Sequence, residues 1–253
     1  MSIVLRALLI LAALMLVAGC AGSGGNGNWG WYVVSPSTSQ GMTNIQFLLG
    51  GLKDTIILSV VSIVLAMVLG FLIALPGIAA NRTAQAINVT YVELVRAVPL
   101  LVLILWVYYG LPQVAGMSVS IFLASVLALG ISDSAFQAEI FRAGIQSVQR
   151  GQIEAADAMG LKYGQKMRLI ILPQAIKVIL PPLGNQFVYM LKMSSLASVI
   201  GMQELTRRAN ELVVTEYRPL EIYTFLILEY LVLILIVSAG VRWLERKMQT
   251  EEH

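Results

Sequence analysis

Several ionisable side chains lie inside or beside long apolar runs of this sequence, and they are the residues best placed to do chemistry. A charged group is costly in lipid, so such a residue usually faces a protein interior or a water-filled path. The residues concerned are Glu93, Arg96, Asp133, Glu139, Arg142, Lys177 and Lys192. Their chemistry would be the recognition of opposite charge rather than the making of bonds.

Asp133 and Lys192 are the two candidates for direct contact with a ligand. Asp133 has a serine hydroxyl on each side and no obvious local partner, so its carboxylate could meet an ammonium group. Lys192 could meet a carboxylate in the same way. Each side chain could instead extend to the membrane interface or pair across helices.

Two other pairs of opposite charge are spaced three residues apart, Glu93 with Arg96 and Glu139 with Arg142. Residues at this spacing are neighbours on the surface of a helix. We therefore expect each pair to form an ion pair near the inner boundary of the membrane, and the alternative is that these groups line a path through the protein.

The residue types needed for catalysis are scarce. The chain has one cysteine, Cys20, and one histidine, His253, which leaves no internal disulfide, zinc site or Cys/His pair. The apolar runs hold no paired aspartates and no Ser/His couple, which argues against an intramembrane enzyme. No G-x-x-x-x-G-K-[ST] loop is present to bind phosphates. We expect neither a catalytic site nor a cofactor nor a metal site in this chain.

The composition places the chain in a bilayer. Hydrophobic residues make up 58% of it and charged residues only 12%, with a mean hydropathy of +0.80, whereas soluble domains have roughly 25% charged residues. Lipid must therefore be the solvent for much of the surface. The small net charge of +3, without a basic run, gives no indication of a nucleic acid partner.

Apolar runs predict an all-α membrane protein with about five transmembrane helices. The predicted spans are residues 52–78, 87–111, 118–135, 169–202 and 222–241. The fourth run is interrupted by Pro173, Pro181 and Pro182, so we expect a kinked helix that lines an interior.

The chain begins with a segment that resembles an export signal. Residues 1–20 hold one base, Arg6, then a short apolar run and small residues before Cys20. Residues 17–20 resemble a lipobox and predict lipid attachment at Cys20, and the alternative is an uncleaved signal anchor. Residues 21–45 are rich in Gly, Ser and Asn and are predicted to be a flexible linker outside the cytoplasm. The transmembrane domain would cover residues 46–248 and a cytoplasmic tail residues 249–253.

The distribution of bases predicts the orientation. With residue 21 outside and five crossings, ten Lys and Arg residues fall in inner segments and four in outer ones. An excess of bases on the cytoplasmic side is the usual rule. We therefore expect a multi-pass protein of the cytoplasmic (inner) membrane with its C-terminus in the cytoplasm.

Residues 154–173, "EAADAMGLKYGQKMRLIILP", would form a loop on the inner side between spans three and four. The residues from Glu154 to Met159 are good helix formers, and Gly160 can end that helix before a second one begins. Apolar positions within and beside this helix predict a small apolar surface patch suited to a protein partner. The alternative is an amphipathic loop at the membrane interface. These positions are Ile153, Ala156, Met159 and Leu161.

Four motifs in order resemble the polar amino acid ABC transporter permease family, the inner-membrane subunits of binding-protein-dependent importers. The loop resembles the EAA motif of that family, with Glu154, Ala155 and Ala156 followed by Gly160. The four motifs are "YVELVRAVPLLVLILWVYYGLP" (91–112), "AEIFRAGIQSVQRGQIEAA" (138–156), which runs into the loop, "LPQAIKVILPPLGNQF" (172–187) and "LKMSSLASVIG" (191–201). The resemblance runs from about residue 50 to residue 241.

The resemblance implies the type I ABC importer permease fold and a division of labour between subunits. Cytosolic ABC ATPase subunits would bind ATP and Mg, and would be coupled to this chain through the loop of about residues 143–168. The coupling residues would be Glu154, Ala155, Ala156, Gly160 and Leu161. Other expected partners are a second permease copy or a related permease, an extracytoplasmic amino acid-binding protein and membrane lipids.

The resemblance also implies that the chain forms a translocation path for a polar amino acid. The candidate residues of this path are Glu93, Arg96, Pro99, Asp133, Glu139, Lys192, Ser194 and Ser195. The alternative function is a secondary transporter or a channel-like protein, because polar broken helices occur there too.

Overall fold

The computed structural model describes residues 30–79, 81–116 and 118–249. Every regular element in these ranges is a helix, which confirms the all-α class. The signal-like segment with Cys20, residues 21–29 of the expected linker, and residues 250–253 lie outside the described residues. The elements are η1 (Trp31–Val34), α2 (Ser39–Ile78), α3 (Arg82–Ala97), α4 (Leu100–Leu105), η2 (Trp106–Gly110), α5 (Leu111–Ala115), α6 (Ile121–Gln146), α7 (Arg150–Ala158), α8 (Tyr163–Lys166), η3 (Met167–Ile171), α9 (Leu172–Met193), η4 (Ser194–Ile200), α10 (Leu205–Glu216) and α11 (Pro219–Gln249).

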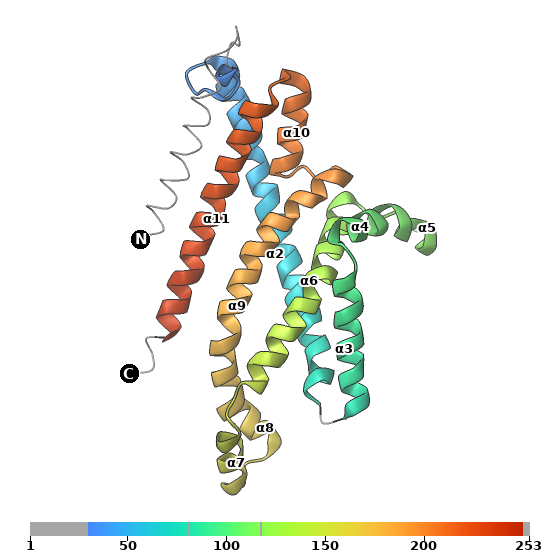
Figure 1. The fold of residues 1–253 in the computed structure, drawn as a ribbon, viewed down its shortest axis with the longest axis vertical. Helices are drawn as coiled ribbons and strands as arrows, with labels where there is room; N and C mark the ends of the chain where they lie inside the picture. Colours follow the sequence, from blue (N-terminus) through green and yellow to red (C-terminus); the bar gives the residue numbers. More distant parts are fainter. Residues whose placement is uncertain (1–29, 80, 117, 250–253) are drawn as a thin grey trace.

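Four helical stretches in the described residues are long and apolar enough to cross a membrane: α2, α6, the stretch from Tyr163 to Ile200, and α11. A bent pair, α3 followed by α4, η2 and α5, makes a fifth if it counts as one broken span. The expectation of about five transmembrane helices is therefore confirmed. Figure 1 shows these helices running between an end that carries α10 and an end that carries α7.

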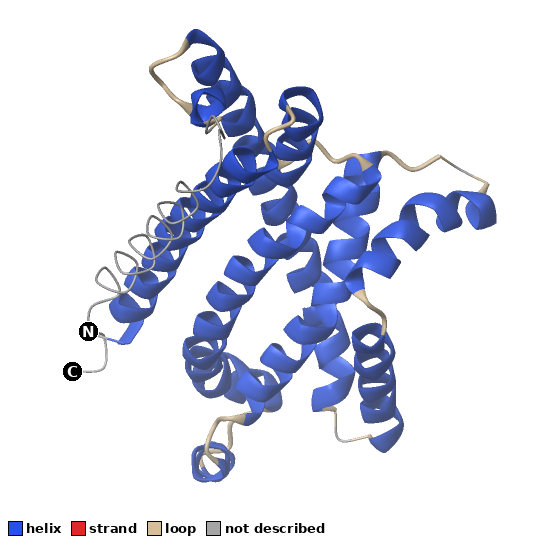
Figure 2. Ribbon diagram, turned by 45° about the horizontal axis from the view of Figure 1, so that its top comes forward, coloured by secondary structure: helices blue, strands red, loops and turns tan. Residues whose placement is uncertain are grey.

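The second predicted span, residues 87–111, is not a straight helix. Its two halves meet at an angle of 91°. The bend falls at Val98 and Pro99, because a proline disfavours helical geometry in the residue before it, and Val98 is extended with φ −86° and ψ 123°. As a result, α3 runs along the bundle while α4, η2 and α5 extend sideways from it (Figures 1 and 2).

The third and fourth predicted spans also differ from the structure. The third span begins at Ile121, where the Ser120 hydroxyl accepts the Leu123 amide, and α6 continues to Gln146 instead of ending at residue 135. In the fourth span, Pro181 and Pro182 lie inside α9 without ending it. The helix departs from regular α geometry earlier, in the π-turn η3 just before Pro173. Proline has no amide hydrogen to donate to a helical hydrogen bond.

Helix α6 is the central element of the bundle. In the most apolar 18-residue stretch of α6, 61% is buried inside the protein. The corresponding share is 33% for α2, 17% for the stretch from Tyr163 to Ile200 and 11% for α11. Glycines allow α2 to approach it closely, since a Cβ on Gly70 would lie 2.4 Å from Gln137 and one on Gly130 would lie 2.7 Å from Leu65. The other helices therefore present most of their apolar surface outwards, as lipid-facing helices do.

Residues 30–45 of the expected flexible linker (21–45) are mostly helical and packed. Helix η1 buries Val33 and Val34, and α2 begins at Ser39. The Asn44 amide donates to the Val33 carbonyl at 3.0 Å and to a Glu216 oxygen at 3.1 Å. This part of the linker prediction is wrong, because Gly and Ser content alone does not reveal contacts made far along the chain.

Candidate functional site

A helical hairpin at the α7 end contains all five residues expected to couple the chain to an ATPase. Helix α7 carries Glu154, Ala155 and Ala156, and the following turn carries Gly160 and Leu161. Helix α8 follows this turn, so the predicted helix, turn and second helix are confirmed. The hairpin forms the lower tip of the molecule in Figure 1.

The turn of this hairpin has the Schellman geometry. The Leu161 amide donates to the Ala156 carbonyl at 3.1 Å, and the Gly160 amide donates to the Asp157 carbonyl at 2.9 Å. Gly160 has φ +72°, in the left-handed region that residues with a Cβ rarely adopt. A Cβ there would meet no atom within 4 Å, so glycine is needed at this position for its left-handed backbone conformation and not because space is short.

Two side-chain contacts brace the hairpin. Lys166 Nζ lies 2.6 Å from Asp157 Oδ1 and joins α8 to α7. The Gln174 amide of α9 donates to the side-chain oxygen of Gln152 in α7. The hairpin is therefore tied to the helix that continues into the membrane.

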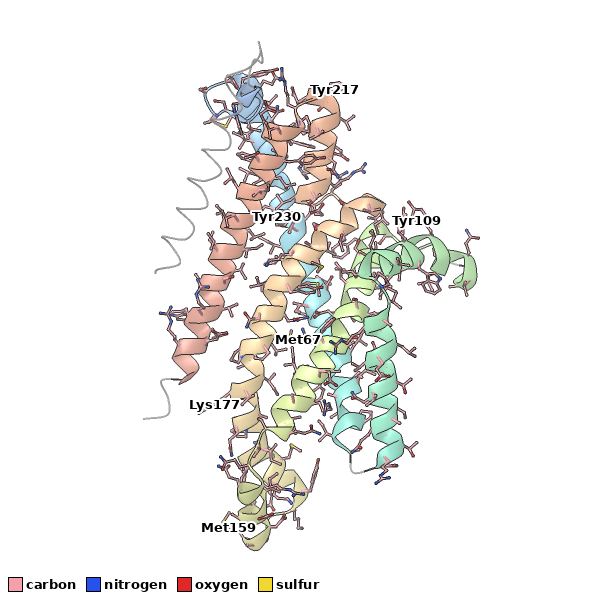
Figure 3. All side chains as sticks on the ribbon, viewed as in Figure 1. Met67, Tyr109, Met159, Lys177, Tyr217 and Tyr230 are labelled. Atoms are coloured by element: carbon pink, nitrogen blue, oxygen red, sulfur yellow. The ribbon has the colours of Figure 1, made fainter. Side chains whose placement is uncertain are left out.

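The surface of the hairpin is partly charged and partly apolar. Glu154 and Ala155 are exposed, and Met159 is 69% exposed at the tip (Figure 3). Ala156 is fully buried within the chain and Leu161 is half-buried, so the predicted apolar face is divided between internal packing and exposure. An exposed methionine on a braced hairpin is the kind of apolar contact that a protein partner can cover.

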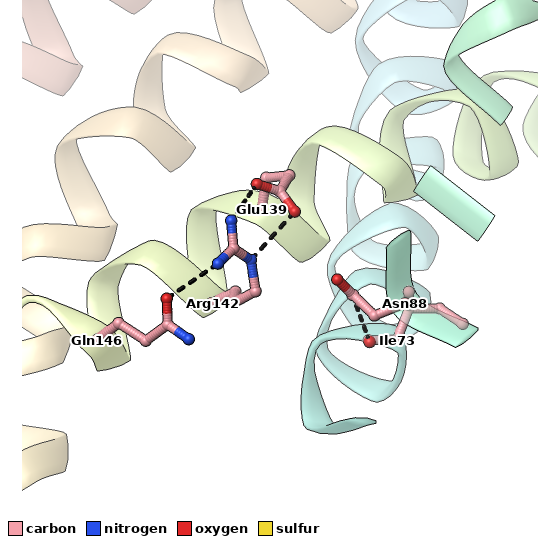
Figure 4. Close-up of polar contacts among 5 residues, drawn as sticks. All are labelled: Ile73, Asn88, Glu139, Arg142 and Gln146. Carbon is pink, nitrogen blue, oxygen red and sulfur yellow. Dashed lines mark hydrogen bonds and ion pairs between the residues drawn. The ribbon is translucent and has the colours of Figure 1, made fainter. Parts of the chain in front are cut away.

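The predicted ion pair between Glu139 and Arg142 is confirmed. Arg142 donates through Nη2 at 2.7 Å and through Nε at 3.2 Å to the two carboxylate oxygens of Glu139. Its Nη1 also donates to Gln146 at 2.9 Å (Figure 4). Beside this group, the Asn88 amide of α3 donates to the Ile73 carbonyl of α2, which joins the ends of these two helices.

The predicted pair between Glu93 and Arg96 does not form in the described chain. The Arg96 guanidinium lies 4.8 Å above the Phe136 ring of α6 instead, and Glu93 is exposed. A cation over an aromatic face is attractive, so α6 competes with the local carboxylate for this arginine. Pro99, the third candidate in this region, precedes α4 at the bend.

Asp133 has two partners that sequence reasoning missed. The side-chain amide of Gln137 donates to one of its oxygens at 2.8 Å, and the amide of Gln186 in α9 donates to the other. Asp133 is only 4% exposed. The aspartate therefore links α6 to α9, and its contact with a substrate stays a prediction.

The candidates on α9 and η4 divide into exposed and buried residues. Lys192 is exposed at the end of α9. Ser194 is fully buried and its hydroxyl donates to the Leu191 carbonyl, while the half-buried Ser195 donates to the Lys192 carbonyl. Both hydroxyls thus satisfy backbone groups of the last helical turn.

A small hollow brings α4, α6 and α9 together next to these candidates. Its lining residues are Leu100, Leu129, Ser132, Asp133, Phe136, Tyr189, Met190 and Met193. Arg96 of α3 lies over the ring of Phe136, which lines the hollow, and Lys192 belongs to α9, which borders it. Across the described ranges no three His, Cys, Asp or Glu side chains gather closely enough to hold a metal ion.

Sequence reasoning also missed Glu204, a fully buried acid outside the spans. It caps α10 by accepting the amides of Thr206 and Arg207, at 2.9 and 2.7 Å, and it accepts the Tyr230 hydroxyl of α11 at 2.8 Å. Burial raises the pKa of the Glu204 carboxyl, although these hydrogen bonds oppose the shift. An acid just before a helix, with its cap to the second and third residues, was the available signal.

Glu229 was missed in the middle of the last predicted span. Both of its carboxylate oxygens are buried without a hydrogen-bond partner among the described residues. It lines an apolar pocket of about 290 Å³ between α2 and α11. A single acid within an apolar run could have revealed this residue, but the mean hydropathy of the run stayed high despite it.

Comparison with protein families matches residues 66–250 to the model described as "Binding-protein-dependent transport system inner membrane component". Among curated proteins, the chain is 40% identical to a probable glutamine ABC transporter permease protein of Bacillus subtilis (strain 168), over 81% of this chain and 95% of that protein. It is 36% identical to an arginine transport system permease protein of the same organism, over 82% and 95%. It is 34% identical to a glutamine transport system permease protein of Escherichia coli (strain K12), over 81% and 94%.

Solved structures give the same result. The chain is similar to a subunit in a crystal structure of an amino acid ABC transporter with histidines, with a TM-score of 0.76 and 40% identity over 81% of this chain and 96% of that one. An inward-facing methionine ABC transporter shares the fold with a TM-score of 0.72 at 19% identity, over 83% of this chain and 99% of that chain.

Proposed function

Because the chain belongs to the family of binding-protein-dependent transport system inner membrane components, we infer that it is the membrane-spanning permease subunit of an ABC importer for a polar amino acid. Subunits of this family transport and do not catalyse, so the chain is a transport subunit and not an enzyme. The relatives named as glutamine and arginine permeases support an amino acid as the substrate class.

The observation that carries this function is the braced hairpin of α7 and α8. It projects from the end of the bundle, its turn is fixed by a left-handed glycine, and it exposes Glu154, Ala155 and Met159. An open hollow of about 690 Å³ beside it is lined by Lys162, Arg168 and their neighbours. A cytosolic ABC ATPase would cover this surface and would bind the ATP and Mg that this chain has no loop to hold.

The orientation supports the same arrangement. The hairpin at the α7 end carries several bases, Arg82 starts α3 towards that end, and α11 runs in the same direction with Arg242, Arg246 and Lys247 in its last turns. We place this end and the C-terminus in the cytoplasm of the inner membrane, following the positive-inside rule. The α10 end, with the start of α2, then faces outwards, where an amino acid-binding protein would deliver the substrate.

The translocation path would run along the side of the bundle where α3, α6 and α9 present polar side chains. Arg96, Glu139 and Lys192 offer charges of both signs, which suits a substrate with both an ammonium and a carboxylate group. A second permease copy or a related permease would complete the path.

Purification of the complex tests this function. The chain should be retained with an ABC ATPase subunit, and the reconstituted complex should import a labelled polar amino acid at the expense of ATP. Glu154→Lys reverses an exposed charge on α7 and should weaken retention of the ATPase. Arg82→Glu, an exposed reversal at the same end but outside the hairpin, is the control. Equal retention by both variants would contradict a coupling role for the hairpin.

A further inference from the structure

Tyr217 ends α10 in a backbone conformation that is rare for a large side chain. Its φ is 54° and its ψ is 35°, and in the described ranges no other residue except glycine has a positive φ. The ring has little contact with the rest of the chain to offset this, because Tyr217 is 82% exposed. Bulky residues are uncommon in the left-handed region, and such outliers gather at functional sites. Internal packing therefore does not explain why a tyrosine occupies this position.

Carboxylates on both sides of Tyr217 hold this turn against the start of the described chain. The two Glu216 oxygens accept the side-chain amide of Gln40 at 2.9 and 2.8 Å, and the Asn44 amide donates to one of them at 3.1 Å. Glu221 accepts a backbone amide from the start of the described chain at 2.7 Å. The turn between α10 and α11 is thus fixed, and Figure 3 shows Tyr217 at the end of the molecule opposite α7.

The contacts of α10 with α2 determine the height of this turn above the bilayer. Residues 55–78 of α2 hold no charged side chain, and at about 1.5 Å per residue they cover about 36 Å, enough for a hydrocarbon core of about 30 Å. Helix α10 begins level with the outer end of this stretch, where the Leu205 amide donates to the Thr55 hydroxyl at 3.2 Å. It ends level with Asn44, about 16 Å farther out along α2. The head-group layer is only about 5–8 Å thick on each side, so Tyr217 lies beyond it, in water.

The surface beside Tyr217 offers apolar atoms more than charge. Val214, one turn earlier in α10, is 68% exposed. The two arginines of α10 are engaged within the chain, since Arg207 donates to Glu211 at 2.8 Å and Arg208 lies 3.6 Å from an acid of α2. A partner would therefore meet an aromatic ring with a hydroxyl at its tip, beside an aliphatic side chain. Tyrosine is among the residues that most often carry the binding energy of protein interfaces.

We propose that Tyr217 is the residue whose ring the extracytoplasmic amino acid-binding protein buries when it docks on this subunit. The proposal rests on the proposed function, whose orientation puts the α10 end outside. The description of the family names a binding protein as the component on which transport depends. The ring would enter a shallow apolar pocket of that protein, with a hydrogen-bonding group for the hydroxyl. Because the turn is fixed before the partner arrives, little ordering is left to oppose binding.

Tyr217→Gly tests the proposal, because glycine adopts the left-handed conformation without strain and the variant loses only the side chain. The complete importer in nanodiscs is titrated with its purified amino acid-binding protein, loaded with amino acid. The Kd should rise about tenfold or more in Tyr217→Gly, while the unfolding temperature of the subunit should not fall. Tyr217→Phe should keep most of the affinity. Tyr109→Ala is the control, because Tyr109 is also exposed, at 60%, but lies in η2, away from this turn.

The outcomes separate this contact from the importer function. Wild-type affinity in Tyr217→Gly would overturn the proposal and leave the importer function intact, whereas a wild-type complex that binds no amino acid-binding protein would overturn both. Tyr217→Asn repeats the test if the glycine variant inserts poorly, since asparagine tolerates this conformation. A photo-crosslinking phenylalanine analogue at position 217 should capture the binding protein. Capture of phospholipid instead would place the ring at the membrane surface and would also overturn the proposal.

Discussion

Gly160 is the residue whose substitution should separate insertion from coupling. Gly160→Val places a β-branched side chain at φ +72° and should strain the turn by about 1–2 kcal/mol or more. Insertion should be unaffected, because the turn lies outside the spans. We expect normal abundance in the membrane and reduced substrate-stimulated ATP hydrolysis by the complex in liposomes.

The matched control for this variant is Gly151→Val, in α7 of the same hairpin. A Cβ at either glycine meets no atom within 4 Å, but Gly151 has no positive φ. Gly160→Asn should keep more activity than Gly160→Val, since asparagine tolerates the left-handed region. If Gly160→Val hydrolyses ATP and transports at the wild-type rate, the shape of this turn does not serve coupling.

Two acids on α11 should respond in opposite ways to the same substitution. Among the described residues the buried carboxylate oxygens of Glu229 have no hydrogen-bond partner, whereas Glu221 accepts the Gly30 amide at 2.7 Å. Glu229→Leu should stabilise the subunit by about 1–3 kcal/mol, because it removes an unsatisfied buried group. Glu221→Leu should destabilise it by leaving an amide unpaired. Thermal unfolding in nanodiscs measures both, and a loss of stability in Glu229→Leu would show that this carboxyl has a partner in the assembled importer.

At the scale of the element, the cap of α10 should depend on pH. Burial raises the folded-state pKa of Glu204 above its ordinary 4.5, so the folded state holds its proton more tightly than the unfolded state does. The stability that Glu204 contributes through this shift is complete below pH 4.5 and is lost as pH rises through the raised folded-state pKa. Hydrogen exchange of α10 should therefore accelerate over that interval, beyond the intrinsic rate.

Glu204→Gln provides the control for this pH dependence. The amide keeps an acceptor for the Thr206 and Arg207 amides but cannot ionise, so protection of α10 should be flatter with pH. Glu204→Ala removes the cap and should cost about 0.5–2 kcal/mol. An unchanged pH profile in Glu204→Gln would assign the effect to another group.

For the whole molecule, the testable property is its direction in the membrane. Met159 is 69% exposed at one end and Tyr217 is 82% exposed at the other (Figure 3). Cys20 is the only cysteine in the sequence, so Cys20→Ser gives a background without thiols. In that background Tyr217→Cys should react with an impermeant thiol reagent in intact spheroplasts, and Met159→Cys only after permeabilisation. The reverse labelling pattern would show that the protein has the opposite orientation in the membrane.

Local sequence signals predicted much of the fold, whereas the contacts between distant segments could not be predicted from the sequence. The hairpin was predictable, because helix formers followed by Gly160 determine it within a few residues. The bend at Pro99 was not predicted, although the proline was visible, because the apolar run after it suggested one continuous span. The partners of Asp133 and Arg96 include Gln186 and Phe136 on other segments, and Gln186 is 53 residues away from Asp133. No spacing rule reveals such contacts before the helices are placed.

The central position of α6 has a consequence for biogenesis. A ribosome delivers α2 first, then α6, and α9 only later, so Asp133 leaves the ribosome before Gln186 exists to bind it. Until then its carboxylate is paired only with Gln137 of the same helix, and an aspartate near the middle of a span costs about 2.5–3.5 kcal/mol during translocon insertion. We therefore expect α6 of a nascent chain truncated after Lys166 to remain partly outside the bilayer, and a chain extended to Met193 to insert it fully. Glycosylation mapping of both lengths measures this, and complete insertion of the shorter chain would show that Gln137 and the preceding helices are sufficient partners.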